Sequence, residues 1–260
     1  MGRKRKSFRK IVYWSLNSAK NRISKGNNKY SLGILWYLLQ PLSLFFVLVF
    51  VMSFVFERNY DNYPLYLIIG LIMFNFFRGS TIKCMNAVNS IAKKKNPLVS
   101  VTSIFFEAIF AHFFELIILV VLLIFYGNSP LGIIFYPSIF LFFGIFVYGI
   151  SLMLFVVRTF SEDMSKLWII FLRALWFVTP NFYFIEKSSP LYEINLFNPL
   201  FYFIYIVRTV ILDNTLPELW MVITIISVSI FSFVMGIYTF NKYGYNYTKT
   251  KFNKELFFNF

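Results

Sequence analysis

Long apolar stretches alternate with short polar segments along the whole chain. A helix needs about 20 apolar residues to cross a hydrocarbon core roughly 30 Å thick. The pattern predicts six such helices, at Leu35–Phe56, Leu65–Met85, Ile104–Tyr126, Ile133–Val157, Leu167–Tyr183 and Leu219–Phe240. We therefore expect an all-α integral membrane protein, in which residues 1–260 form one domain whose six-span bundle occupies residues 35–240.

Two further segments are helical in pattern without the length of a span. In residues 1–30, apolar or small residues recur at helical spacing (Phe8, Ile11, Val12, Ser15, Leu16, Ala19 and Ile23), and basic residues lie between them. This predicts an amphipathic helix along the cytoplasmic interface, although a basic anchor that only sets topology would have the same charge. The stretch Leu200–Leu212 is apolar but short and contains Arg208, so we expect a re-entrant or interfacial helix outside, between the fifth and sixth spans.

Composition and charge agree with this picture. Apolar residues make up 58% of the chain and charged residues 14%, with a mean hydropathy of +0.67, which excludes an ordinary soluble domain. The net charge of +14 is concentrated before Tyr30, where there is no acid. This is the bias of a cytoplasmic face rather than of a nucleic-acid groove, so both termini and the tail 241–260 are predicted to be cytoplasmic. The single Cys84 excludes a disulfide or a cysteine-based zinc site within one chain.

Motifs for catalysis are missing from the sequence. It contains no GxxxxGK[ST] loop for a nucleoside triphosphate and no HExxH, GxSxG or Asp-rich metal motif, so no catalytic residue and no metal ligand is predicted. Glu107, His112 and Glu115 fall on one side of the third predicted span. The alternatives are a polar stripe packed inside the bundle and bonded to Arg78 or Arg173, the lining of a substrate pathway, and a role in proton relay or catalysis.

Four motifs, in order along the chain, resemble those of ABC-2-type permeases, most closely the ones that export O-antigen, capsule and teichoic acid. The first is Lys29-Tyr30-Ser31-Leu32-Gly33-Ile34-Leu35-Trp36-Tyr37-Leu38-Leu39-Gln40-Pro41-Leu42. The others are Tyr63-Pro64 followed by Gly70 and Phe74, Asp163 followed by Thr179-Pro180 and Tyr183, and Asn198-Pro199 followed by Arg208. The resemblance gives structural roles to Gly33, Pro41, Pro180, Asn198, Pro199 and Arg208. The chain departs from the family at Glu162, where an arginine is usual, and at Arg173, where a neutral polar residue is frequent.

The resemblance implies a half-transporter in the cytoplasmic membrane. Two copies would pair with two copies of a separate ATPase subunit, which would bind the ATP and Mg²⁺, while this chain would bind no cofactor. Residues expected to contact the ATPase are Arg22, Ile91, Lys93, Lys94, Lys95, Asn96, Pro97, Glu162 and Asp163. The three lysines could instead merely follow the positive-inside rule.

The substrate pathway is predicted around a kink at Pro41, because proline removes a helical hydrogen bond. Its expected lining is Trp36, Tyr37, Phe45, Phe46, Glu107, His112, Glu115 and Arg173. The leading function is ATP-driven export of a polysaccharide, with the membrane lipid and the glycan as further partners. The alternatives are an exporter of a drug or small lipid, a membrane-embedded enzyme acting on lipid-linked sugars through the third-span acids, and a passive pore or assembly factor.

Overall fold

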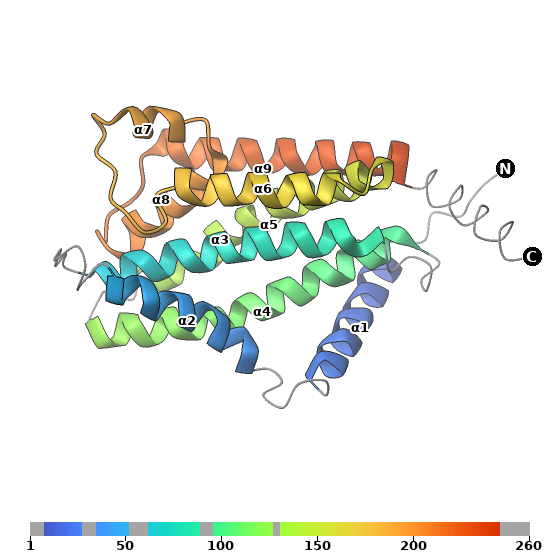
Figure 1. Cartoon of the computed structure of the whole chain (residues 1–260), viewed down its shortest axis with the longest axis horizontal. Helices are drawn as coiled ribbons and strands as arrows, with labels where there is room; N and C mark the ends of the chain where they lie inside the picture. Colours follow the sequence, from blue (N-terminus) through green and yellow to red (C-terminus); the bar gives the residue numbers. More distant parts are fainter. Residues whose placement is uncertain (1–7, 28–34, 52–61, 89–95, 127–130, 245–260) are drawn as a thin grey trace, which may run out of the picture.

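The computed structural model describes residues 8–27, 35–51, 62–88, 96–126 and 131–244, and the described residues are helical with no strand among them (Figure 1). The helices, in chain order, are α1 Phe8–Asn27, α2 Trp36–Phe50, α3 Tyr63–Met85, α4 Pro97–Tyr126, α5 Leu131–Phe160, α6 Met164–Val178, α7 Pro190–Asn195, α8 Pro199–Ile211, α9 Leu219–Thr239 and the π-helical turn η4 Phe240–Gly244. We call the end of the bundle that carries α1 and η4 the inner end, and the end that carries α7 and α8 the outer end.

Four helices among the described residues are long and apolar enough to cross a membrane. They cover Tyr63–Val88, Pro97–Tyr126, Ile134–Phe160 and Leu219–Gly244, which confirms four of the six predicted spans as apolar helices of sufficient length. The helix α2 is apolar over its 15 residues, and the remainder of the predicted first span lies outside the described residues.

The predicted fifth span is wrong at its outer end. The helix α6 stops at Val178, and Thr179 has an extended backbone with ψ at 131°. The ring of Pro180 clashes with a helical conformation of the residue before it, so Thr179 is forced out of the helix. At 1.5 Å per residue the 15 residues of α6 measure about 22 Å, less than the hydrocarbon thickness.

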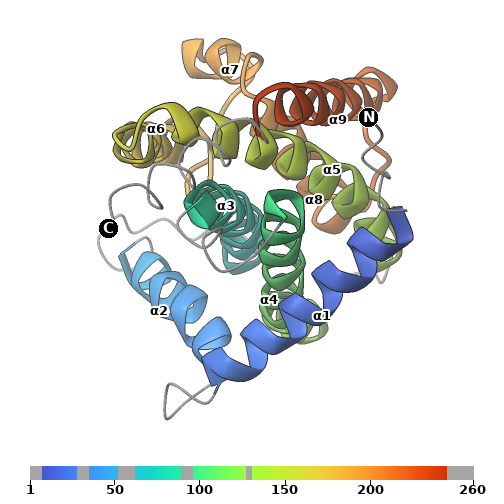
Figure 2. The same ribbon diagram turned by 90° about the vertical axis from the view of Figure 1, so that its right-hand side faces the viewer.

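The helix α3 is the centre of the bundle, and most of its residues are buried. Viewed from the inner end, α2, α4, α5 and α6 surround it (Figure 2). The most extensive helix pair is α5 with α9, where two glycines allow close approach: a Cβ added at Gly149 would meet the backbone of Ser232, and one added at Gly236 would lie 2.5 Å from the Gly149 carbonyl oxygen. Small residues at such a contact let two membrane helices pack backbone to backbone.

The helix α1 crosses the inner end and packs on α4 (Figure 2). The predicted helix is confirmed. Within its predicted apolar face, the side chain of Leu16 is 49% exposed, whereas Ser15 and Ala19 are buried. Small side chains at these positions allow the two helices to approach closely, and this turns Leu16 away from α4.

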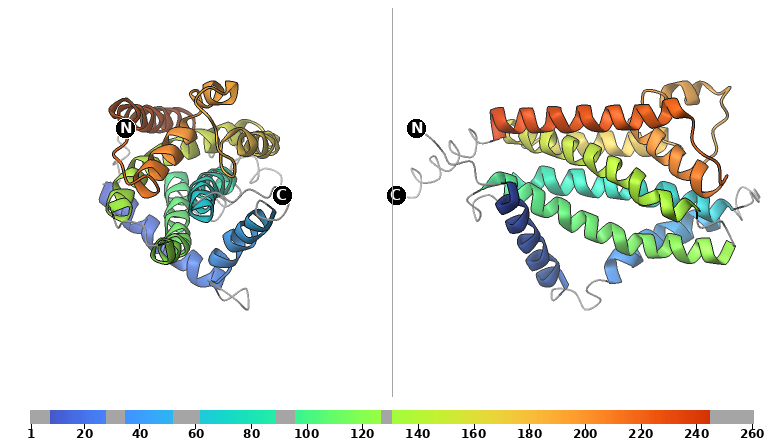
Figure 3. Two further views of the ribbon diagram at one scale, coloured as in Figure 1. Left: turned by 90° about the vertical axis from the view of Figure 1, so that its left-hand side faces the viewer. Right: turned by 180° about the vertical axis from the view of Figure 1, so that it is seen from behind.

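The helix α8 confirms the prediction of a short helix that is not a span. It lies inside the outer end against α3, α5 and α9 rather than on an exposed interface, and ten of its residues are buried (Figure 3). The short helix α7 was not predicted; it begins at Pro190 and is capped by Ser189, whose side chain accepts a hydrogen bond from the backbone N–H of Leu191. The helix α7 contacts the end of α6 through Asn195, whose Nδ2 donates to the carbonyl oxygen of Val178 at 2.9 Å.

Candidate functional site

A buried arginine holds the chain where it leaves α6. The Arg208 side chain on α8 is only 7% exposed, and its guanidinium lies 3.4 Å from the centre of the Tyr66 ring on α3. Its Nη1 donates to the carbonyl oxygen of Pro180 at 2.6 Å, and its Nη2 donates to those of Asn181 and Tyr66, both at 2.9 Å. We call Tyr66, Pro180, Asn181 and Arg208 the arginine clamp.

The clamp satisfies the backbone carbonyls of Pro180 and Asn181, which lie beyond the end of α6, and also binds that of Tyr66 in the first turns of α3. Buried backbone acceptors are costly when unpaired, and an arginine with its fork of N–H donors can reach several at once. Burial lowers the pKa of Arg208 to about 10, so the side chain is still a cation at neutral pH. The ring of Tyr66 adds a cation–π contact. Arg208 therefore ties α3, α8 and the segment after α6 together.

Gly70 leaves room for this arrangement on α3. A Cβ at this position would lie 2.6 Å from Nη2 of Arg208 and 2.7 Å from the carbonyl oxygen of Asn181. A larger residue would therefore displace either the guanidinium or the chain after α6. The glycine that marked the second motif in the sequence is required by this contact.

Two tyrosines of α3 donate hydrogen bonds to the same segment, and a third tyrosine, Tyr183, belongs to the segment and bonds back to α6. The hydroxyl of Tyr63 donates to the Phe182 carbonyl oxygen at 2.9 Å, and that of Tyr66 donates to the Tyr183 carbonyl oxygen at 2.7 Å. The hydroxyl of Tyr183 turns back to the carbonyl oxygen of Val178 at 2.7 Å. Burial raises the pKa of Tyr183 to about 12, so this hydroxyl is protonated and can donate at neutral pH.

Asn198 joins the last motif to the same place. Its Nδ2 donates to Oγ1 of Thr179 at 2.8 Å, and its Oδ1 accepts from the backbone N–H of Leu200, which caps α8 at its first turn. Pro199 stands at the first position of α8, where its fixed φ suits a helix start. Residues of three of the four sequence motifs thus meet in one cluster at the outer end, whereas Asp163 of the third motif lies at the inner end.

The polar stripe of α4 is packed against α3 and α5. Oε1 of Glu107 lies 3.9 Å from Nζ of Lys83, and Oε2 of Glu115 lies 3.5 Å from Nδ1 of His112. Nε2 of His112 shares a hydrogen bond of 2.7 Å with the hydroxyl of Tyr136, and the imidazole stacks on Phe140 at 4.3 Å. These partners differ from the two arginines considered from the sequence.

The other residues predicted to line a pathway are divided between the core and the surface. Phe45 is buried, while Trp36 and Phe46 on α2 and Arg173 on α6 are exposed. Pro41 is buried within α2, which continues through it. Nothing is described for the side chain of Tyr37, and Gly33 lies outside the described residues.

Residues predicted to contact an ATPase lie at the inner end where they are described. Asn96 accepts a hydrogen bond from the backbone N–H of Leu98 and precedes Pro97, the first residue of α4. Glu162 and Asp163 are exposed in the turn between α5 and α6, and Arg22 is half-buried on α1. Ile91, Lys93, Lys94 and Lys95 lie outside the described residues.

The turn between α5 and α6 has an arginine partner of its own. Nη1 of Arg158 donates to the carbonyl oxygen of Glu162 at 3.1 Å and also to the hydroxyl of Ser165. An arginine one turn earlier thus braces the turn in which the resemblance expects an arginine beside Asp163. Although this chain has Glu162 where the family usually has an arginine, Arg158 therefore still stabilises the turn.

Sequence reasoning missed two members of the arginine clamp. Tyr66 lies one helical turn before Gly70, and this spacing is a weak signal that the two share a face of α3. Asn181 contributes its backbone carbonyl, which no side-chain pattern reveals. The carbonyl oxygens held by Arg208 could only be identified in the folded chain.

These features define a helical membrane protein whose outer end is closed by a motif-bearing cluster. No family model matches the chain. It is 25% identical over 231 residues to the O-antigen export system permease protein RfbA of Klebsiella pneumoniae, in an alignment that covers 84% of this chain and 87% of the relative. This confirms the recognition made from the motifs: the chain is a distant homologue of an O-antigen export system permease.

Proposed function

We propose that the chain is the membrane-spanning permease subunit of an ATP-driven exporter that moves a polysaccharide across the cytoplasmic membrane. The substrate would be a lipid-linked O-antigen, a capsular polysaccharide or a teichoic-acid-type glycan. Two copies would assemble with two copies of a separate ATPase subunit that binds ATP and Mg²⁺. This chain would supply the conduit and the mechanical coupling.

The observation that carries the proposal is the extent of the relationship to the O-antigen export permease. It covers 84% of the chain, so it spans most of the helical bundle rather than one short motif. The cluster around Arg208 and Asn198 supports it, because motif residues far apart in sequence lie in contact.

The proposed topology has six spans with both termini in the cytoplasm. The helices α2 and α6 run beside α3 (Figure 1). Together with the four long helices they make up the six proposed spans. The short α8 would be re-entrant at the outer end, where its backbone is buried in protein as a non-spanning segment in a membrane requires. The basic residues before Tyr30 orient the inner end toward the cytoplasm.

The pathway is proposed on the flank of α3 where α2 and α6 both lie (Figure 2). Trp36 and Phe46 on α2 and Arg173 on α6 are exposed and available to a substrate or a second copy. Aromatic faces suit the C–H faces of sugars. Glu107, His112 and Glu115 are assigned to bracing α4 against its neighbours, because their partners are Lys83 and Tyr136.

The ATPase is proposed to dock at the inner end on α1, on the segment Ile91–Pro97 and on the turn that carries Glu162 and Asp163. The helix α1, the start of α4 at Pro97 and the turn between α5 and α6 lie at that face (Figure 1), and a docked rigid segment can transmit a rigid-body movement. The two acids are exposed and so can meet a basic partner.

The test is co-purification with the ATPase encoded beside this chain, followed by ATP hydrolysis in lipid. The double change Glu162→Lys and Asp163→Lys should reduce both co-purification and coupled hydrolysis. Its matched control is Glu186→Lys with Glu193→Lys, which reverses two exposed acids near α7 at the outer end. Equal behaviour of the two variants would reject docking at this turn.

The substrate is tested in cells that lack the chain. Surface polysaccharide should be lost and lipid-linked glycan should accumulate on the cytoplasmic side, with rescue by the wild-type chain. Unchanged surface polysaccharide together with altered drug susceptibility would instead support the drug-exporter alternative and contradict the proposal.

A further inference from the structure

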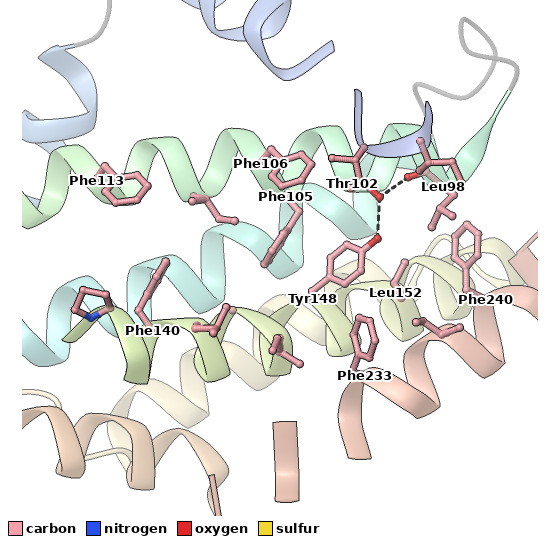
Figure 4. Close-up of a pocket in the computed structure, with 18 of the residues that line it drawn as sticks. Leu98, Thr102, Phe105, Phe106, Phe113, Phe140, Tyr148, Leu152, Phe233 and Phe240 are labelled. Atoms are coloured by element: carbon pink, nitrogen blue, oxygen red, sulfur yellow. Dashed lines mark hydrogen bonds between the residues drawn. The ribbon is translucent and has the colours of Figure 1, made fainter. Parts of the chain in front are cut away.

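A long apolar groove lies between α4 on one side and α5 and α9 on the other (Figure 4). Its volume is about 690 Å³, and α1 and η4 contribute Ile11, Val12, Phe240 and Asn241 to its lining. The groove exists because α5 packs extensively on α9 but touches α4 sparsely. Phe113 and Leu141 at its walls are 57% and 61% exposed, so the groove opens sideways to the surroundings of the bundle.

The groove is elongated along the helix axes. On α4 its lining extends from Leu98 to Leu116, and on α5 from Tyr136 to Leu152. At 1.5 Å per residue these stretches measure about 27 Å and about 24 Å. A compact solute does not need a site of this shape, whereas an extended hydrocarbon chain running along the membrane normal fits it.

The groove wall has few polar groups that are free to bind water. Its lining contains no charged residue, and its hydroxyls already have partners: Thr102 and Tyr148 share a hydrogen bond of 2.7 Å, and Tyr136 is bonded to His112. Apolar cavities in proteins stay dry, and protein interiors do not retain voids of this size. In a bilayer, the acyl chains of lipids are the molecules available to occupy such a groove.

Gly144 lies on the groove and marks it as open space. A Cβ added there would meet no atom within 4 Å, although Gly149, five residues further along α5, has no room at all. A helix interior ordinarily favours alanine over glycine by about 0.5–1 kcal/mol. The missing side chain at Gly144 widens the groove midway along α5.

Two exposed lysines are next in sequence to residues that line the inner end of the groove. Lys10 precedes Ile11 on α1, and Lys242 follows Asn241 in η4, with its Nζ 5.1 Å from the centre of the Tyr243 ring. The described acids toward the inner end have basic partners or lie in the turn after α5: Glu107 lies 3.9 Å from Lys83, and of Glu162 and Asp163 in the turn, Asp163 is paired with Lys166 at 3.3 Å. The mouth is thus complementary to a negative charge held at the membrane surface.

We propose that this groove binds an anionic phospholipid of the cytoplasmic leaflet. One acyl chain lies between α4 and α5, and the phosphate lies at the inner mouth near Lys10 and Lys242. The site is separate from the flank of α2 and α6 proposed for the glycan. The lipid proposal therefore does not depend on which substrate is exported. A lipid in this position holds α1 and α4 against α5 and α9.

The acyl-chain half of the proposal is tested by filling the groove. The full chain is reconstituted in nanodiscs with a phosphatidylglycerol that carries a photoreactive acyl chain, and the labelled peptides are mapped. Wild type and Gly144→Ala should be labelled on α4 and α5, and Gly144→Phe should lose this labelling several-fold. Gly79→Phe is the matched control, because a Cβ at Gly79 on α3 also meets no atom within 4 Å and Gly79 does not line the groove.

The headgroup half is tested by charge. Lys10→Gln with Lys242→Gln should lower the preference for phosphatidylglycerol over phosphatidylcholine about tenfold. Lys20→Gln with Lys166→Gln removes the same charge from the inner end away from the groove and should leave the preference unchanged.

Three results would overturn the proposal. The first is that Gly144→Phe is labelled on α4 and α5 to the same extent as the wild type. The second is that phosphatidylcholine and phosphatidylglycerol label the wild type equally. The third is that an isoprenoid phosphate added at equal concentration displaces phosphatidylglycerol from the wild type. The last two use the wild-type chain, so they decide the matter even if Gly144→Phe fails to fold.

Discussion

The arginine clamp and the lipid groove are opposite solutions to packing within one helical bundle. Around Arg208, donors and acceptors from α3, α8 and the segment after α6 are matched, and Gly70 is present because a Cβ would collide. In the groove, α4 and α5 stay apart, and a Cβ at Gly144 would meet nothing. One region has no tolerance for added atoms, and the other is open to a ligand. The same residue type therefore has opposite meanings in the two places.

The largest expected effect comes from removing the guanidinium. Arg208→Met leaves the carbonyl oxygens of Tyr66, Pro180 and Asn181 buried without these donors, at a cost of about 3–5 kcal/mol. The midpoint of thermal unfolding in detergent should fall on the order of 10 °C. Arg208→Lys, which keeps the charge but reaches fewer carbonyls, should fall between wild type and Arg208→Met; equal midpoints for all three would show that the clamp does not stabilise the fold.

A smaller loss is expected from crowding the clamp. Gly70→Ala places a methyl group against Arg208 and the Asn181 carbonyl and should cost about 2–3 kcal/mol, because both neighbours are held by other bonds. Gly79→Ala on the same helix serves as control and should be neutral or slightly stabilising. The two variants are compared by their unfolding midpoints, and an equal change in both would contradict the role given to Gly70.

The seam between α5 and α9 should respond in the same direction but less strongly. Gly149→Ala forces α5 away from the backbone of Ser232, at a cost of about 1–2 kcal/mol, since the two helices can separate by a small rigid shift. Cysteine cross-linking between the two helices reports that shift. A variant that keeps both the wild-type cross-linking yield and the wild-type midpoint would mean that the seam is looser than described.

The smallest effect is expected in the groove and has the opposite sign. Gly144→Ala should stabilise the chain by about 0.5–1 kcal/mol, because alanine is the better helix former and its methyl group enters open space. A rise in the unfolding midpoint of a few degrees is the expected result. A fall comparable with that of Gly149→Ala would show that the groove is closed in solution.

Much of the secondary structure was predictable from the chain alone. Four spans and the short outer helix follow from the length of apolar runs, because a buried backbone in a membrane must satisfy its own hydrogen bonds. The end of α6 was predictable in principle from Pro180 and was missed, because the apolar run continues past it. The motif residues at the outer end were recognised, but their mutual contacts were not.

The packing faces could not be predicted, for a physical reason. A helix that is apolar all round carries no stripe to mark its neighbour, so neither the seam of α5 with α9 nor the gap between α5 and α4 is visible in the pattern. The exposure of Leu16 on α1 could not be predicted either, since the small residues Ser15 and Ala19 decided the contact with α4.

The sequence by itself determined that this chain is an apolar helical protein with a basic inner end and a set of exporter-like motifs. Those properties are local: they depend on composition, run length and short spacings. Only the tertiary structure decided that Arg208 would bind the carbonyl of Tyr66, 142 residues away, and that Gly70 would be crowded while Gly144 faces open space. These are relations between distant segments, and they arise when the helices pack and every buried donor must find its acceptor.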